Sequence, residues 1–367
     1  MKEDFLDKKL NERKENNAFR QLRLPDNKID FCSNDYLGIV KNNLLESLMH
    51  KAKSVKQLTH GSTGSRLLAG NYLLIEETEK ILADFHDSEA GLIFNSGYDA
   101  NVGLLSCVPQ RGDTIIYDYL SHASLRDGIR LSFANAFSFL HNDLEDLEKK
   151  LKVAVGNIFV VTESLFSMDG DFAPLIEISL LCEKYNASLI IDEAHATGVV
   201  GEKGEGLVQH LHLQTKCFAR IHTFGKAVGA HGAIILGSKK LKDYLINFSR
   251  AFIYTTSLPE VSVETIKNSY EIFPSLINER SHLQNLITHF QSSLIKFEKL
   301  KSETPIQIVI VPGNENVKML AQKLQDNNLD VRAILYPTVP KNAERLRIVL
   351  HAFNTIDEVD LLINNLK

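Results

Sequence analysis

Cysteines and long apolar segments are scarce in this sequence. Its four cysteines, Cys32, Cys107, Cys182 and Cys217, lie far apart and form no C-x-x-C pair, so we expect neither a disulfide scaffold nor a cysteine metal site. The charged start, MKEDFLDKKLNERKE, has no apolar core of a signal peptide. No apolar run approaches the roughly 20 residues that a transmembrane helix needs. These absences predict a soluble, cytoplasmic protein with no membrane partner.

A basic face and the common phosphate and metal motifs are missing too. With 41 Lys and Arg against 46 Asp and Glu, the net charge is −5, which argues against a nucleic-acid partner. The GSTGSR stretch at 61–66 lacks the lysine of a P-loop and the G-x-G-x-x-G pattern, so it supports nucleotide binding only weakly. His210 and His212 do not share a helix face and have no carboxylate cluster, so no metal is expected.

The 367 residues exceed what one core usually serves, which predicts a large and a small domain. Between residues 88 and 237, continuous apolar runs typical of buried strands alternate with helix-length segments: AGLIFNS, DTIIYD, NIFVVTES, ASLIIDEAH and GAIILGS. This alternation predicts an α/β fold with a mostly parallel sheet. Beyond residue 260 the pattern becomes α+β, with strands at PIQIVIV and RLRIVLH. The expected division is an N-terminal arm (1–40), a large domain (41–268) and a small C-terminal domain (269–367).

Several predicted strands end in polar residues, and ligands of parallel sheets bind beyond the carboxyl ends of the strands. One strand runs into Asp192 and then His195, another into Ser96–Tyr98 at the start of a helix, and a third ends near Ser167. Lys226 stands in a glycine-rich turn, HTFGKAVGAHG. We expect these strand ends to face one cleft.

Each feature also has a simpler interpretation. Asp192 is at a position where a carboxylate often caps a helix, His195 alone is typical of a structural histidine, and NSGYDAN is compatible with an ordinary turn. Together they are more specific. A desolvated lysine forms Schiff bases with aldehydes, an aspartate keeps a pyridine nitrogen protonated, and a helix N-terminus holds phosphate. Pyridoxal 5′-phosphate needs these three groups.

The sequence resembles the fold-type I pyridoxal-phosphate enzymes, and among them the α-oxoamine synthases, from about residue 20 to 355. The resemblance rests on stretches that occur in the family's order: SNDYLG, GSTGSR, FNSGYDAN, DYLSHASL, VVTESLFSMDGDFAPL, DEAHATGVVGEKGEG, TFGKAVGAHGA and YTTSLP. It implies a large domain with a mostly parallel central sheet, a smaller α+β C-terminal domain, and an acyltransferase that condenses an amino acid with an acyl thioester.

The resemblance also implies roles for individual residues. Lys226 would form the Schiff base and move the Cα proton, Asp192 would pair with the pyridine nitrogen, and His195 would lie near the phenolic oxygen. His122 would stack on the cofactor ring and reach the substrate. Further cofactor contacts would come from Ser96, Gly97, Tyr98, Ser167 and Thr223. Thr255 and Thr256 would serve the neighbouring subunit of a homodimer.

The tail AILYPTVPKNAERLRIVLHA most resembles the branch of the family that joins L-alanine to a pimeloyl donor, on CoA or a carrier protein, for biotin synthesis. By that match Arg347 would bind the amino-acid carboxylate, with Arg20, Asn34 and Thr338 also at the substrate. Other amino-acid and acyl specificities within the family stay open, as does an aminotransferase. Three departures from the usual pattern, Ala196 for glycine, Ile75 for histidine and Tyr98 for phenylalanine, bear on acyl specificity.

Overall fold

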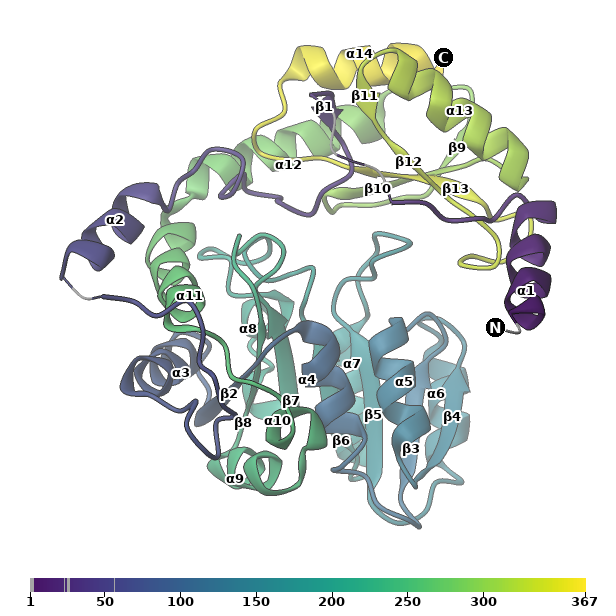
Figure 1. Ribbon diagram of the computed structural model, residues 1–367. Helices are drawn as coiled ribbons and strands as arrows, with labels where there is room; N and C mark the ends of the chain where they lie inside the picture. The colour runs from purple at the N-terminus through teal and green to yellow at the C-terminus, as the bar shows by residue number, and fades with distance from the viewer. Residues whose placement is uncertain (1–2, 23, 25–26, 56) are drawn as a thin grey trace. The chain divides into compact units, whose positions relative to one another are not determined.

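The computed structural model describes residues 3–22, 24, 27–55 and 57–367, and its chain forms two compact units (Figure 1). The large unit comprises Leu37–Ser167 and Phe172–Asn278, and the small unit comprises Met1–Tyr36, Met168–Asp171 and Glu279–Lys367. None of the helices in the described parts of the chain is both long and apolar enough to cross a bilayer.

A seven-stranded sheet organises the large unit, in the order β2-β8-β7-β6-β5-β3-β4. Only β8 is antiparallel to its neighbours, so the other strands of this sheet end at one common edge. The mostly parallel α/β sheet is therefore confirmed. Its strands are β2 (Ala90–Phe94), β3 (Thr114–Asp118), β4 (Asn135–Phe139), β5 (Ile158–Glu163), β6 (Ser188–Asp192), β7 (Cys217–Thr223) and β8 (Ala233–Gly237).

The sequence pattern predicted five of these strands but not β4 and β7. β4 lies at the edge of the sheet, and its first three residues are exposed, so it has no apolar run. β7 is buried but carries Arg220 and His222, and these polar side chains interrupt the apolar pattern by which buried strands are identified.

Helices surround this sheet, and Figure 1 shows α4 and α5 side by side in front of it. In α7, the side chains of Leu175, Ile178 and Cys182 are buried. The helices are α2 (Glu46–Val55), α3 (Leu73–Phe85), α4 (Gly97–Leu105), α5 (Ala123–Leu131), α6 (Leu144–Leu151), α7 (Leu175–Lys184), α8 (Leu207–His210), α9 (Lys239–Phe248), α10 (Arg250–Ile253) and α11 (Glu260–Ile272), with 3-10 turns η1 (Gln214–Lys216) and η2 (Phe273–Ser275).

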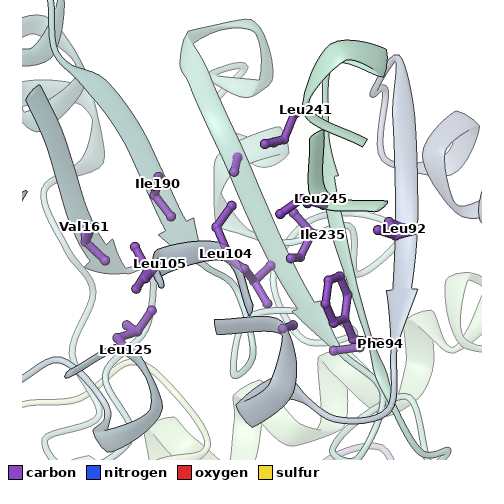
Figure 2. Packing of buried hydrophobic residues seen from close by; sticks show 14 of the residues in the cluster. Leu92, Phe94, Leu104, Leu105, Leu125, Val161, Ile190, Ile235, Leu241 and Leu245 are labelled. Atoms are coloured by element: carbon purple, nitrogen blue, oxygen red, sulfur yellow. The ribbon is translucent and has the colours of Figure 1, made fainter. Parts of the chain in front are cut away.

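The main core of the large unit lies between α4, α5, α9 and the sheet. Leu104 and Leu105 of α4 are fully buried, together with Leu125 of α5 and Ile190 of β6 (Figure 2). Each such side chain contributes about 1.5–3 kcal/mol through its removal from water. This packing fixes the N-terminus of α4 at the edge where the parallel strands end.

The small unit contains a four-stranded antiparallel sheet in the order β12-β13-β10-β9. Helix α13 packs on β12 and β13, and α14 begins with a capping box between Thr355 and Glu358. The elements are α1 (Asp4–Glu15), α12 (Ile277–Ser292), β9 (Glu298–Lys299), β10 (Ile306–Ile310), α13 (Asn314–Asp326), β12 (Arg332–Ile334), β13 (Arg345–Val349) and α14 (Ile356–Leu366). The α+β character and both strands predicted here are confirmed.

The N-terminal segment differs from the separate arm expected over 1–40. β1 (Ile29–Asp30) pairs in parallel with β11 (Leu329–Asp330), and the backbone N–H of Val349 donates to the carbonyl oxygen of Phe31 at 2.9 Å. Residues 29–36 therefore belong to the small unit, because their backbone groups find partners near the other end of the chain. Helix α1, which lies within the described residues, buries no side chain.

Candidate active site

A cavity of about 240 Å³ lies at the edge of the large sheet where the parallel strands end. Every strand end that the sequence singled out by its polar residues contributes to it, and the strand near Ser167 does so through Glu163 rather than through Ser167. The predicted residues that line the cavity are Ser96, Gly97, Tyr98, His122, Asp192, His195, Thr223 and Lys226.

Lys226 is half-buried and stands in a compact turn between β7 and β8. The backbone N–H of Phe224 donates to the carbonyl oxygen of Gly232 at 2.9 Å, and that of Gly229 donates to the carbonyl oxygen of Lys226 at 2.8 Å. Gly229 and Gly232 have φ of +64° and +111°, values that favour glycine. The turn therefore holds the lysine backbone firmly and leaves the side chain facing the cavity.

Asp192 is the last residue of β6 and is 5% exposed. Its Oδ1 accepts the backbone N–H of Ala194 at 2.9 Å, and its Oδ2 accepts the side-chain amide of Asn101 at 2.8 Å. The first bond is the local turn contact that a purely structural aspartate would make. The second comes from α4 and orients the carboxylate at the wall of the cavity.

The N-terminus of α4 forms one end of the cavity. Ser96 caps the helix, accepting the backbone N–H of Asp99 at 3.0 Å, and a Cβ atom on Gly97 would come 2.5 Å from Thr223 Cγ2. Thr223 is 9% exposed, and its Oγ1 has no hydrogen-bond partner among the described residues. Free N–H groups at a helix start, next to an unpartnered hydroxyl, are suited to an anion.

His122 and Glu163 form a further wall. Glu163 Oε1 accepts the backbone N–H of His122 at 2.6 Å, and the imidazole Nδ1 of His122 lies 2.7 Å from Ser124 Oγ. Burial, reinforced by the nearby negative charge of Asp192, raises the pKa of Glu163 to about 8. Partial desolvation lowers the pKa of His122, and Asp192 acts in the opposite direction.

Sequence inspection missed seven of the residues that line the cavity, among them Asn101, Glu163 and His231. Glu163 ends a buried strand, so the criterion that selected Asp192 would have found it. Asn101 lies one helical turn after Gly97, and His231 belongs to the same glycine-rich turn as Lys226. Asn101 could have been identified from the sequence, because a residue four positions after Gly97 lies on the same face of a helix.

Three predicted cofactor residues do not line this cavity in the described part of the chain: Ser167, Thr255 and Thr256. Ser167 is buried, at 8% exposure, at the point where the chain passes to residues 168–171 of the small unit. Thr255 and Thr256 are bonded to Asn95 instead. Asn95 Nδ2 donates to Thr255 Oγ1 and to the carbonyl oxygen of Thr256, both at 2.8 Å.

The predicted substrate residues of the small unit form two pairs. Arg347 donates to Asn34 Oδ1 at 3.0 Å, and the same oxygen accepts the hydroxyl of Tyr36 at 3.2 Å. Burial raises the pKa of Tyr36 to about 12, although Arg347 acts against this. Arg20 donates to Thr338 Oγ1 at 3.0 Å. Residues more than 300 positions apart are thus brought together in the same unit.

The three departures from the family pattern lie in different surroundings. Ala196 and Ile75 are buried, at 0% and 1% exposure, so their extra apolar atoms are packed in the interior. Tyr98 is half exposed at the cavity, and its hydroxyl donates to Asp127 at 2.7 Å. This hydrogen bond raises the pKa of Tyr98 and ties the start of α4 to α5, which a phenylalanine would not do.

These groups fit pyridoxal phosphate. Lys226 offers an amine, Asp192 a fixed carboxylate, and the Ser96–Tyr98 segment with the unpartnered Thr223 hydroxyl an anion site, all around one cavity. Those are the groups on which the cofactor depends for covalent attachment, pyridine protonation and phosphate binding.

Comparison with known proteins agrees with this geometry. The model of the aminotransferase class I and II family matches residues 26–366, and the chain belongs to that family. A relative from Emericella nidulans, 8-amino-7-oxononanoate synthase, is 38% identical over 99% of this chain and 94% of its own. The 8-amino-7-oxononanoate synthase structure from Francisella tularensis has a TM-score of 0.79 at 28% identity, covering 93% of this chain and 97% of its own. A serine palmitoyltransferase variant from S. paucimobilis, solved with a bound PLP–myriocin aldimine, has a TM-score of 0.87 at 25% identity, covering 100% and 96%.

Proposed function

We propose that this protein is a pyridoxal-phosphate-dependent 8-amino-7-oxononanoate synthase. The reaction joins L-alanine to a pimeloyl thioester, on CoA or a carrier protein, and releases the thiol and CO2, as a step of biotin biosynthesis. The observation that carries the proposal is the single cavity lined by Lys226, Asp192, His122 and the N-terminus of α4. Similarity to relatives of that name over nearly the whole chain supports the choice within the family.

When bound, the cofactor would withdraw electrons from the amino-acid Cα, which makes the Cα proton removable. Lys226 Nζ accepts that proton and later returns one to the same carbon. Asp192 would accept the hydrogen bond of a protonated pyridine nitrogen, and Asn101 keeps the carboxylate of Asp192 in place. His195, which lines the same cavity, would lie near the phenolic oxygen of the bound cofactor. The resemblance also assigns Ser167 to the cofactor pocket, although Ser167 does not line the cavity in the described part of the chain.

His122, which lines the cavity, would cover the cofactor ring and orient the acyl carbonyl. Its backbone is fixed by the hydrogen bond to Glu163, whose raised pKa keeps this carboxyl protonated near neutral pH. The protonated form adds no second negative charge beside Asp192, so the two carboxyl groups take different roles in one cavity.

Arg347 binds the substrate carboxylate, because a guanidinium matches a carboxylate with two parallel hydrogen bonds. Asn34 holds the guanidinium of Arg347 in place. The hydrogen-bonded pair Arg20 and Thr338 contributes to the binding of the acyl donor. The proposed assembly is a cytoplasmic homodimer in which Thr255 and Thr256 complete the partner's site. The hydrogen bonds from Asn95 that present this segment, with Thr256 exposed, support that role.

The decisive variant is Lys226→Ala. It should abolish the yellow absorbance of the lysine-bound cofactor and the release of thiol, because Lys226 supplies the amine at the cavity that would form the Schiff base. Retention of both would refute the proposal. Wild-type product should be measured with alanine, glycine and serine against acetyl, succinyl, pimeloyl and palmitoyl donors. Preference for alanine with pimeloyl is expected.

A second candidate function is that of a serine palmitoyltransferase or another α-oxoamine synthase such as glycine C-acetyltransferase. Its support is the close structural match to serine palmitoyltransferase. A preference for serine with palmitoyl, or glycine with acetyl, in the same assay would favour it. Exchange of the amino group with a keto acid, without thiol release, would instead indicate an aminotransferase.

A further inference from the structure

His231 stands between the two loops that make the anion site. Strand β8 begins at Ala233, which pairs with Thr223 of β7 on one side and with Phe94 of β2 on the other. His231 therefore enters the sheet edge where β2 leads into Ser96–Tyr98 and β7 leads into Lys226. Its side chain is exposed and lines the cavity.

The backbone around His231 is tightly constrained. Gly232 has φ of +111°, and a Cβ atom there would come 2.9 Å from the carbonyl oxygen of Phe94. The backbone N–H of Phe224 donates to the carbonyl oxygen of Gly232 at 2.9 Å. These contacts hold the turn against both neighbouring strands, so the position of the His231 Cα atom is fixed by the sheet.

The end of the cavity next to His231 contains a buried polar group that has no hydrogen-bond partner among the described residues. Thr223 Oγ1 is unpartnered and its side chain is nine-tenths buried, next to the N-terminus of α4. The charged groups here are Lys226, which lines the cavity, and Asp99 in the first turn of α4, whose Oδ2 accepts the Ser96 hydroxyl at 2.8 Å. A ligand with several acceptor oxygens would satisfy the free donors.

We propose that His231 is a phosphate-binding residue of this chain, whose imidazole N–H donates to a phosphate oxygen of the cofactor held by Thr223 and the start of α4. The inference rests on the proposed function, since it assigns the anion to pyridoxal phosphate. It adds a side-chain ligand to a site otherwise built from backbone N–H groups and hydroxyls.

The test compares two aldehydes that differ only in the phosphate. Apo-protein is titrated with pyridoxal 5′-phosphate and with pyridoxal, and binding is followed by the absorbance of the lysine adduct. His231→Ala should weaken pyridoxal phosphate about tenfold and leave pyridoxal unchanged. His231→Gln, which keeps an N–H donor, should recover part of the affinity. His210→Ala, at an exposed histidine outside the cavity lining, is the matched control.

Phosphorus NMR of the bound cofactor gives a second readout. The resonance should shift in His231→Ala and stay in place in His210→Ala. Equal weakening of both aldehydes, or no weakening of either, would overturn the role of His231 while leaving the proposed function intact. Wild-type protein that binds neither aldehyde would instead refute the proposed function itself.

Discussion

A buried histidine of the small unit and several buried polar groups of the large unit differ in their hydrogen bonding. In the large unit, Thr223 Oγ1, His86 Nδ1 and His222 Nε2 are buried without a hydrogen-bond partner among the described residues. In the small unit, His351 is equally buried, but Ser33 and Asn354 bond both of its ring nitrogens. The buried His351 finds its partners within the small unit, whereas His222 and Thr223 of the large unit each keep one polar atom without a partner among the described residues.

The largest expected effect is on the pH dependence of folding stability, through the buried histidines His86 and His222. The rings of His86 and His222 have their centroids 3.9 Å apart and their planes tilted by 34°. Thr197 Oγ1, two residues after His195, lies 2.9 Å from His222 Nδ1. Burial, with Arg220 nearby, holds the pKa of both well below 6.5. The unfolded chain therefore binds more protons as pH falls below 6.5, so the stability that these neutral rings provide is complete above that value and is lost in acid.

The stability difference between wild type and His222→Gln should accordingly shrink by about 1.4 kcal/mol for each pH unit below 6.5. Urea unfolding followed by circular dichroism from pH 7.5 to 5 measures it. The pKa of His351 is also lowered by burial, but Asp30 opposes the shift, so His351→Gln should show the effect over a narrower range. If the stability difference changed over the same pH range in both variants, the histidines of the two units would not differ in this respect.

The next effect lies in the small unit, where Arg347→Gln should raise the KM for the amino acid by about 10- to 100-fold, since a charge-assisted pair is lost. Steady-state kinetics checks this. Arg332→Gln is the matched control, because Arg332 lies directly opposite Arg347 in the ladder and pairs with Asp330. A similar rise of KM in both variants would show that the integrity of the sheet, rather than the guanidinium of Arg347, determines amino-acid binding.

The smallest expected effect is that of Thr223→Val. With no ligand, removing a buried hydroxyl that has no partner should change the free energy of unfolding by less than about 1 kcal/mol. Cofactor affinity should nevertheless fall about tenfold, because the hydroxyl loses its proposed phosphate partner. Thermal unfolding of the apo-protein and titration with the cofactor separate the two. A large loss of apo stability would mean that the hydroxyl serves the fold instead.

Much of the site was predictable because strand ends are visible in sequence. Continuous apolar runs that stop at Asp192 or Ser96 mark both the strand and its functional end. Glu163 obeys the same rule and was overlooked. The Arg347–Asn34 pair came only from the resemblance, since no local pattern connects residues 313 positions apart.

By itself, the sequence determined the parallel sheet, the glycine-rich turn around Lys226 and the polar residues at the strand ends, because these depend on local composition and periodicity. Only the tertiary structure decided that β7 could bury Arg220 and His222, since Arg220 donates to the carbonyl oxygen of His86 on another element. It also decided that residues 29–36 join the small unit and that His231 lies between two loops. Each of these depends on partners distant in the chain, which periodicity cannot reveal.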